Sequence, residues 1–246
     1  MKFGYDGYNI EHTLFILESL PHHQIEHLRL ELMIDRDDDD EVYILSPLCE
    51  VITKLGQQSL KILETNIEGS GVCLFESFRP LLECSELRDL KIMIPGNRTL
   101  EFNDVQLDTL AQKLKKLRSI HIRHDVDGDR IQTGASLRSL DSFSAYCPDI
   151  RYIGLLICDF KIPSPHRSYS RFTNDMNFEF FDSPLKPKDV FPVSLHLSTI
   201  CRPSSGKPPA IVAGYTEEWI RVTERVKELH TALEIERSWG KSSTRL

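Results

Sequence analysis

The sequence predicts an α/β fold, built as a short and irregular solenoid in which parallel strands alternate with helices. Three observations carry this prediction. A short apolar phrase recurs at a nearly constant spacing, the intervals between its copies show the apolar spacing of helices, and a longer amphipathic segment lies near the end of the chain. The composition agrees with a folded protein, because 40% of the 246 residues are hydrophobic and 27% are charged.

Each copy of the phrase is an apolar pair flanking one residue, usually with an aliphatic residue three positions upstream. The copies are Ile25-x-x-Leu28-Arg29-Leu30, Leu60-Lys61-Ile62, Leu87-x-x-Leu90-Lys91-Ile92, Leu117-x-x-Ile120-His121-Ile122, Ile150-x-x-Ile153-Gly154-Leu155 and Leu195-His196-Leu197. Counted from the first apolar residue of each pair, the steps are 32, 30, 30, 33 and 42 residues. Such alternation is typical of a strand buried on one face, so we expect six strands.

Helices are expected in the intervals between these strands. The apolar spacing is clearest in two sets, Leu48, Val51, Ile52 and Leu55, and Leu107, Leu110, Ala111 and Leu114. Single helices between strands at a near-constant period predict that neighbouring strands run parallel, with the helices on one side. Cys84 and Cys147 stand at the register position of Leu114, so we expect them to pack as small apolar residues.

The organisation changes toward the end of the chain. Residues 1–200 form the expected solenoid, and residues 201–215 form a link rich in Pro, Ser and Gly. Residues 216–239 have the spacing of an amphipathic helix, with an apolar stripe of Trp219, Val222, Val226, Leu229 and Leu233. We expect this helix to cap the last repeat, because an uncapped solenoid end would expose its core.

Two segments resemble metal sites without completing them. Asp125, Asp127 and Asp129 have the spacing of a calcium loop, but Arg130 and Ser136 stand where that loop needs Gly and Glu. We interpret the segment as a polar loop after the fourth strand. The cluster of His22, His23 and His27 lacks a cysteine or carboxylate at a supporting spacing, so it is interpreted as a solvated loop and not as a zinc site.

No nucleotide-binding glycine loop and no nucleophile motif is present in the sequence. We therefore assign no catalytic, cofactor-binding or metal-ligating residue, and expect no cofactor. The N-terminus lacks the pattern of a secretory signal, the apolar runs are too short to cross a bilayer, and none of the six cysteines forms a C-x-x-C pair. These features predict an intracellular protein, cytoplasmic or nuclear, that does not bind membranes.

The net charge is −7, and residues 31–41 alone contribute −6. A chain without a surplus of Lys and Arg is not expected to bind nucleic acid. The acidic run Asp37 to Glu41 follows the first expected strand and is interpreted as a solvated loop tip. A docking patch for a basic partner is the alternative for this run.

The residue between the two apolar positions of each strand projects to the opposite face of the sheet. In the predicted register this column contains Arg29, Lys61, Lys91 and His121, followed by Gly154 and His196. The first four predict a basic strip that binds an acidic or phosphorylated segment of a protein partner. An ordinary soluble sheet face is the alternative.

Two phrases carry a resemblance to a known family. Residues 81–92, Leu-Leu-Glu-Cys-Ser-Glu-Leu-Arg-Asp-Leu-Lys-Ile, and residues 146–153, Tyr-Cys-Pro-Asp-Ile-Arg-Tyr-Ile, resemble the leucine-rich-repeat region of fungal F-box-like proteins. The late helix with Trp219 resembles their usual ending. The resemblance implies a substrate-recognition region for a cullin-type ubiquitin ligase. No F-box, the helical module that docks on the ligase adaptor in that family, is visible before the first expected strand.

Two classes of function follow. The first is a non-enzymatic protein-interaction module of the leucine-rich-repeat type, a substrate receptor for ubiquitination if the resemblance extends to function. The second is a hydrolase or transferase on an irregular α/β scaffold, with a histidine and carboxylate site gathering His121, His124 and Asp125.

Overall fold

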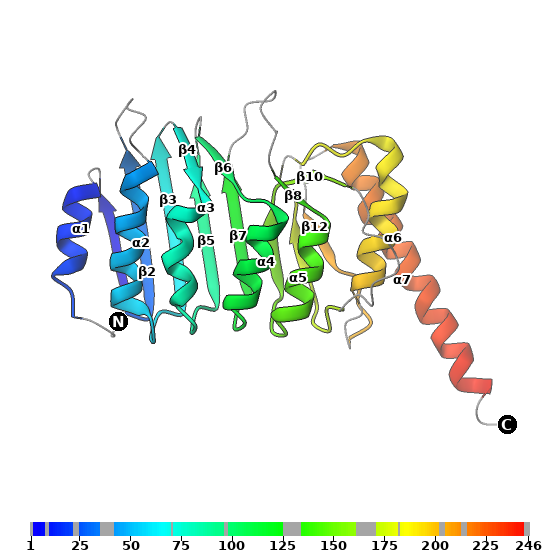
Figure 1. Cartoon of the computed structure of the whole chain (residues 1–246). Helices are drawn as coiled ribbons and strands as arrows, with labels where there is room; N and C mark the ends of the chain where they lie inside the picture. Colours follow the sequence, from blue (N-terminus) through cyan, green and yellow to red (C-terminus); the bar gives the residue numbers. More distant parts are fainter. Residues whose placement is uncertain are drawn as a thin grey trace.

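The computed structural model describes residues 2–7, 10–21, 25–34, 42–69, 71–95, 98–124, 134–160, 171–181, 183–201, 205–212 and 216–243. Eight strands in these ranges form one sheet in which every neighbouring pair is parallel (Figure 1). Their order in the sheet follows the chain: β1 (Lys2–Gly7), β2 (His27–Ile34), β3 (Ile62–Gly69), β5 (Asp89–Ile94), β7 (Ser119–His124), β9 (Tyr152–Leu155), β11 (Asn177–Glu179) and β12 (Ala210–Val212).

Helices connect successive strands and cover one face of the sheet, called here the helical face (Figure 1). They are α1 (Ile10–Glu18), α2 (Val42–Gly56), α3 (Phe75–Phe78) with the 3-10 turn η2 (Arg79–Glu83), α4 (Asp104–Lys113) and α5 (Arg138–Tyr146). Two short parallel ladders join the segments that follow the main strands: β4 (Gly71–Leu74) with β6 (Arg98–Glu101), and β8 (Ala135–Ser136) with β10 (Ile157–Asp159). The predicted α/β class, with parallel strands alternating with helices, is confirmed.

The core lies between the sheet and the helices. Its first layer aligns one buried residue from each of six adjacent strands: Leu28, Leu63, Leu90, Ile120, Ile153 and Phe178. Burying each of these side chains contributes about 1.5–3 kcal/mol. Cys84 and Cys147 are buried among them, and the Cys147 thiol donates to the carbonyl oxygens of Ala111 and Leu114 at 3.6 Å. The packing role predicted for both cysteines is confirmed.

The predicted register of the second strand is wrong by three residues. Leu63, not Leu60, pairs with Leu28 and Leu90, and Thr65 takes the second inward position. Leu60 is the upstream aliphatic residue and is buried before the strand begins. Because Thr65 is polar, the true phrase Leu63-Glu64-Thr65 does not have two apolar positions. The segment Leu60-Lys61-Ile62 does, and the sequence therefore predicts the strand three residues too early.

The sixth expected strand, Leu195-His196-Leu197, is helical and belongs to α6 (Val190–Ile200), which follows the 3-10 turn η3 (Pro187–Asp189). Val193, Leu197 and Ile200 are buried at helical spacing, whereas Leu195 is 45% exposed. Three residues of alternating polarity do not separate a strand from a helix. The strand next to β9 is β11, which contains Phe178 and Glu179.

Residues 201–215 are predicted as a link, but part of this segment, Ala210–Val212, forms a strand of the main sheet. Within the described part of this segment, β12 pairs in parallel with β11, so that Asn177 lies opposite Ala210. A further strand, β1, precedes the first strand expected from the sequence and pairs with β2.

The long helix α7 (Glu217–Ser243) closes the fold after β12. Its first turns pack against α6 and bury Trp219, Val222 and Val226 of the predicted stripe, whereas Leu229 and Leu233 are only half-buried. The indole of Trp219 stacks on Phe180, with ring centroids 4.9 Å apart. The second half of α7 extends away from the sheet (Figure 1). No helix among the described residues is long and apolar enough to span a membrane.

Candidate functional site on the open face of the sheet

The face of the sheet opposite α1 to α5 is called here the open face, because those helices do not cover it (Figure 1). The residue between the two inward positions of each strand lies on it. The register aligns six such residues in one column: Arg29, Glu64, Lys91, His121, Gly154 and Glu179. The column therefore carries both signs of charge, with Glu64 between Arg29 and Lys91.

The basic strip predicted from Arg29, Lys61, Lys91 and His121 needs one correction. Arg29, Lys91 and His121 lie in the column as expected. Lys61 lies in the turn before β3, where its ammonium contacts a carboxylate oxygen of Glu26 at 2.7 Å. The three-residue shift of register moves it there and places a glutamate in the column instead. His196, the last residue of the column predicted from the sequence, is buried in α6 and does not lie on the open face.

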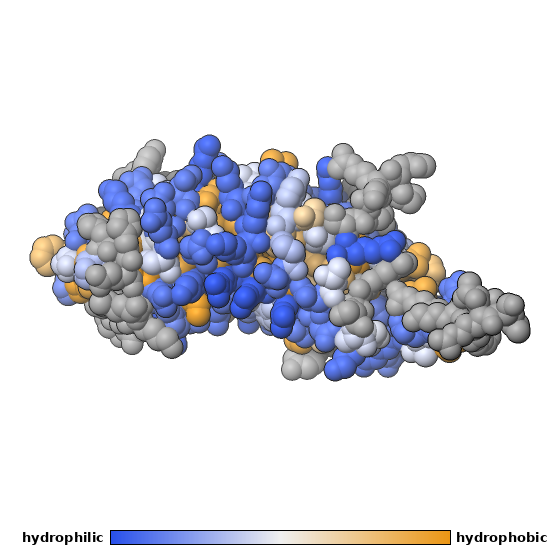
Figure 2. Space-filling view, turned by 90° about the horizontal axis from the view of Figure 1, so that it is seen from below, coloured by the Kyte–Doolittle hydropathy of each residue, from blue (hydrophilic) through white to orange (hydrophobic). Residues whose placement is uncertain are grey.

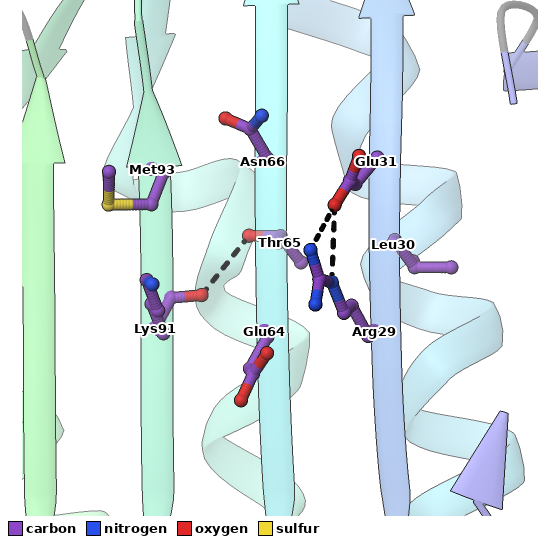
Figure 3. Close-up of a pocket in the computed structure, with 8 residues that line it drawn as sticks. All are labelled: Arg29, Leu30, Glu31, Glu64, Thr65, Asn66, Lys91 and Met93. Atoms are coloured by element: carbon purple, nitrogen blue, oxygen red, sulfur yellow. Dashed lines mark hydrogen bonds and ion pairs between the residues drawn. The ribbon is translucent and has the colours of Figure 1, made fainter. Parts of the chain in front are cut away.

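A shallow pocket of about 200 Å³ lies on β2, β3 and β5 (Figure 3). It is lined by Arg29, Leu30, Glu31, Glu64, Thr65, Asn66, Lys91 and Met93. Arg29 donates to the carboxylate of Glu31, and the Thr65 hydroxyl lies 3.5 Å from the Lys91 carbonyl oxygen. The Glu64 carboxylate lies 3.9 Å from Nε2 of His27.

The charges of the pocket are unequally satisfied. The Lys91 side chain is exposed, and its ammonium forms no ion pair within the described part of the chain. Arg29 and Glu31, which lie two residues apart on β2, by contrast form an ion pair with each other. The pocket thus presents an available cation beside carboxylates, a surface that suits a polar partner with both donors and acceptors.

A second group of polar residues lies farther along the open face, on β7, β9 and β11. The Tyr152 hydroxyl contacts both Nδ1 of His121, at 3.1 Å, and the carboxylate of Glu179. The rings of His121 and Tyr152 stack with centroids 5.9 Å apart. Phe181 packs edge-on against His121, and Arg123 lies over the Phe181 ring.

Gly154 makes this close arrangement possible. A Cβ atom at this position would lie 3.2 Å from His121 Nδ1, Tyr152 Cε1 and Phe181 Cζ. Any other residue at this position would require these neighbours to shift by a few tenths of an ångström. Because Gly154 has no side chain, the side chains of His121, Tyr152 and Phe181 fill the space above it.

The environment sets the protonation of the group. Burial lowers the pKa of His121, and Lys91 and Arg123 act in the same direction against the carboxylate of Glu179. Burial and Glu179 together raise the pKa of the Tyr152 hydroxyl. The two hydrogen bonds are compatible when Tyr152 donates to Glu179 and neutral His121 donates its Nδ1 proton to the Tyr152 oxygen. Nε2 of His121 is then an acceptor, and it is buried without a partner among the described atoms.

This group differs from the catalytic site that the sequence suggested. The alternative enzyme required His121, His124 and Asp125, but Asp125 and the side chain of His124 lie outside the described residues. Tyr152 and Glu179 are the partners that sequence reasoning missed. Glu179 was detectable in principle, since it stands between Phe178 and Phe180 in the same apolar phrase.

The structure describes only some of the other candidate residues. His22, His23, the acidic run Asp37 to Glu41 and the segment Asp125 to Asp129 lie outside the described residues. Ser136, at the twelfth position of the calcium-like segment, donates its hydroxyl proton to Asp104 at 2.5 Å. Among the described residues, no three His, Cys, Asp or Glu side chains gather as metal ligands would.

Comparison of the chain with protein-family models and with curated proteins finds no match.

Proposed function

We propose that the chain is a non-enzymatic protein-interaction module of the leucine-rich-repeat type, and that its open face binds a partner protein. One observation carries the proposal. An eight-stranded parallel sheet, ordered along the chain, has helices on one side (Figure 1). Its register places polar side chains such as Arg29, Glu64 and Lys91 on the other side. Repeat proteins of this organisation use such an extended face for binding.

The details of the open face support a protein partner. Charged and polar side chains alternate across neighbouring strands, so a partner with both signs of charge finds complementary groups at about 4.8 Å intervals. The exposed Lys91 and the half-buried aromatic group around His121 add a cation and a flat apolar surface to the same face. Aromatic and Arg side chains are enriched where proteins bind each other.

Substrate recognition for a cullin-type ubiquitin ligase is the specific role that we propose, on the resemblance to fungal F-box-like proteins. The repeat phrase and the late Trp219 helix support this role. In this role the open face selects the protein to be ubiquitinated.

Affinity purification of the protein from its own cells, followed by mass spectrometry, tests both levels of the proposal. The variant Arg29→Glu with Lys91→Glu reverses the two open-face cations, and Lys54→Glu with Arg138→Glu is the matched control on the exposed surface of the helices. We expect the first variant to lose partners that the control retains. Equal partner sets would refute the open-face proposal, and recovery without a ligase adaptor or cullin would refute the ligase role.

A hydrolase or transferase is the second candidate, and the buried, unpartnered Nε2 of His121 favours it. The chain from Glu179 through Tyr152 to His121 would hold this nitrogen as a general base. Purified protein is tested with nitrophenyl ester and phosphoester substrates. Turnover that His121→Gln abolishes would support an enzyme, whereas turnover unchanged by this substitution would exclude His121 as the base.

A further inference from the structure

A row of basic residues crosses the edge of the sheet at which the strands begin. Lys61, Arg88, Arg118 and Arg151 each directly precede a strand: β3, β5, β7 and β9. The amide of Arg88 donates to the carbonyl of Lys61, that of Arg118 to Arg88, and that of Arg151 to Arg118, at 2.7 to 2.8 Å. Hydrogen bonding between the strands thus continues one residue beyond them, and the four residues, called here the edge row, follow one another at about 4.8 Å.

The arginines of the edge row are available for binding. Arg118 and Arg151 are exposed and Arg88 is half-buried. None of the three guanidinium groups forms a hydrogen bond or an ion pair with any residue that the structure describes. Lys61 differs, because it holds Glu26.

Carboxylates lie near the row but do not cancel it. Glu26 and Glu86 are already engaged by Lys61 and Lys116, which lower the pKa of both carboxyls. Burial raises the pKa of Asp89, although Arg118 and Arg88 oppose this. Asp149 lies in the turn before Arg151.

The turn before β7 adds further positive charge to the row. Residues 113–118 read Lys-Leu-Lys-Lys-Leu-Arg, without an acidic residue, and their Lys and Arg side chains are exposed. Figure 2 looks onto this edge, where hydrophilic residues form a broad band across the described surface. A locally basic edge on a chain of net charge −7 is an uneven distribution of charge that favours a negatively charged partner.

We propose that the edge row binds a carboxylate-rich segment of a partner protein. Guanidinium groups bind carboxylates through paired hydrogen bonds, and three of them follow one another along this edge without a hydrogen bond or ion pair to the described residues. The carboxylates between them disfavour a uniform polyphosphate such as a nucleic acid strand, whereas acidic side chains on a flexible segment avoid them. The inference extends the proposed function, since it gives the chemistry of a partner on a surface distinct from the open face.

Fluorescence anisotropy with a labelled peptide of alternating Glu and Gly tests the proposal on the full chain. The variant Arg88→Gln, Arg118→Gln and Arg151→Gln removes the free guanidinium groups. The matched control Lys54→Gln, Arg138→Gln and Lys188→Gln removes three exposed cations elsewhere. We expect the first variant to bind at least about tenfold more weakly and the control to stay within about twofold of the natural protein.

Several results would overturn the proposal. They are equal binding by the edge variant and the natural protein, equal binding of a Gln and Gly peptide, and tighter binding of a single-stranded oligonucleotide than of the acidic peptide. Circular dichroism melting checks that the variants fold, and single Arg118→Gln and Arg151→Gln changes replace the triple change if it does not. The open-face variant Arg29→Gln with Lys91→Gln should bind the peptide normally, so failure of this inference is distinct from failure of the open-face proposal.

Discussion

Replacement of Trp219 tests whether α7 holds the end of the core together. The side chain is 2% exposed, its indole stacks on Phe180, and it forms a T-shaped ring contact with Phe160. Truncation to alanine removes these contacts and leaves a cavity, which in protein cores costs about 3–5 kcal/mol. Total stability of a domain is about 5–15 kcal/mol, so Trp219→Ala should remove a large share of it.

The hydrogen bond of the indole contributes less than its packing. Its Nε1 donates to the Ser183 carbonyl oxygen at 3.0 Å, but this oxygen also accepts from the amide of Leu185. The oxygen therefore keeps a donor when the indole is lost. Trp219→Phe retains an aromatic ring on Phe180 and should cost about 1–2 kcal/mol.

Urea unfolding followed by far-ultraviolet circular dichroism measures both variants. Ile220→Ala is the control, because this neighbour on the same helix is 53% exposed and should change stability by less than about 0.5 kcal/mol. A loss below about 1 kcal/mol for Trp219→Ala would refute the conclusion that α7 closes the core. Equal losses for the Phe and Ala variants would refute the division between packing and hydrogen bonding.

Three further predictions concern single positions. Gly154→Ala should destabilise the protein by about 1–3 kcal/mol, because the new Cβ meets three side chains at 3.2 Å; an unchanged urea midpoint would contradict this. Burial lowers the pKa of His196 to about 4, so the unfolded chain takes up a proton more readily, and the unfolding free energy should fall by up to about 3 kcal/mol as the pH drops from about 6.5 to 4. The variant His196→Gln should lose this part of the pH dependence, and an identical slope would exclude His196 as its source. Burial raises the pKa of Cys147 to about 12, so its thiol should stay unmodified by a thiol reagent at mildly alkaline pH until urea is added, and rapid labelling of the native protein would disprove its burial.

Much of the fold was predictable because the apolar alternation of most strands can be recognised from a few consecutive residues. Leu90 and Ile92 lie at the alternating inward positions of β5, and Leu87 is buried just before this strand begins. The register of β3 was not predictable in the same way, because Thr65 is a polar residue in an inward position. Its hydroxyl lies 3.5 Å from a neighbouring carbonyl oxygen, a contact that the local sequence does not reveal.

The candidate site depended on distances that no local pattern contains. His121, Tyr152 and Glu179 belong to three strands, and their contact follows from the pairing of those strands. Glu179 escaped prediction because β11 lacks an aliphatic residue three positions before Phe178, where Asp175 stands. The edge row escaped because the turn residue before each strand has meaning only once neighbouring turns are known to be hydrogen-bonded.

The strand order along the sheet bears on how the two proposed binding surfaces could change. The strands β3, β5 and β7 each contribute one residue to the open-face column and are preceded by one residue of the edge row, and none of these residues belongs to the buried layer. A substitution at one of these positions would therefore change the proposed surface at a single step of about 4.8 Å and leave the core residues of that repeat in place. If these surfaces bind a partner as proposed, specificity could evolve one repeat at a time through changes of charge, such as the one made by Glu64 between Arg29 and Lys91.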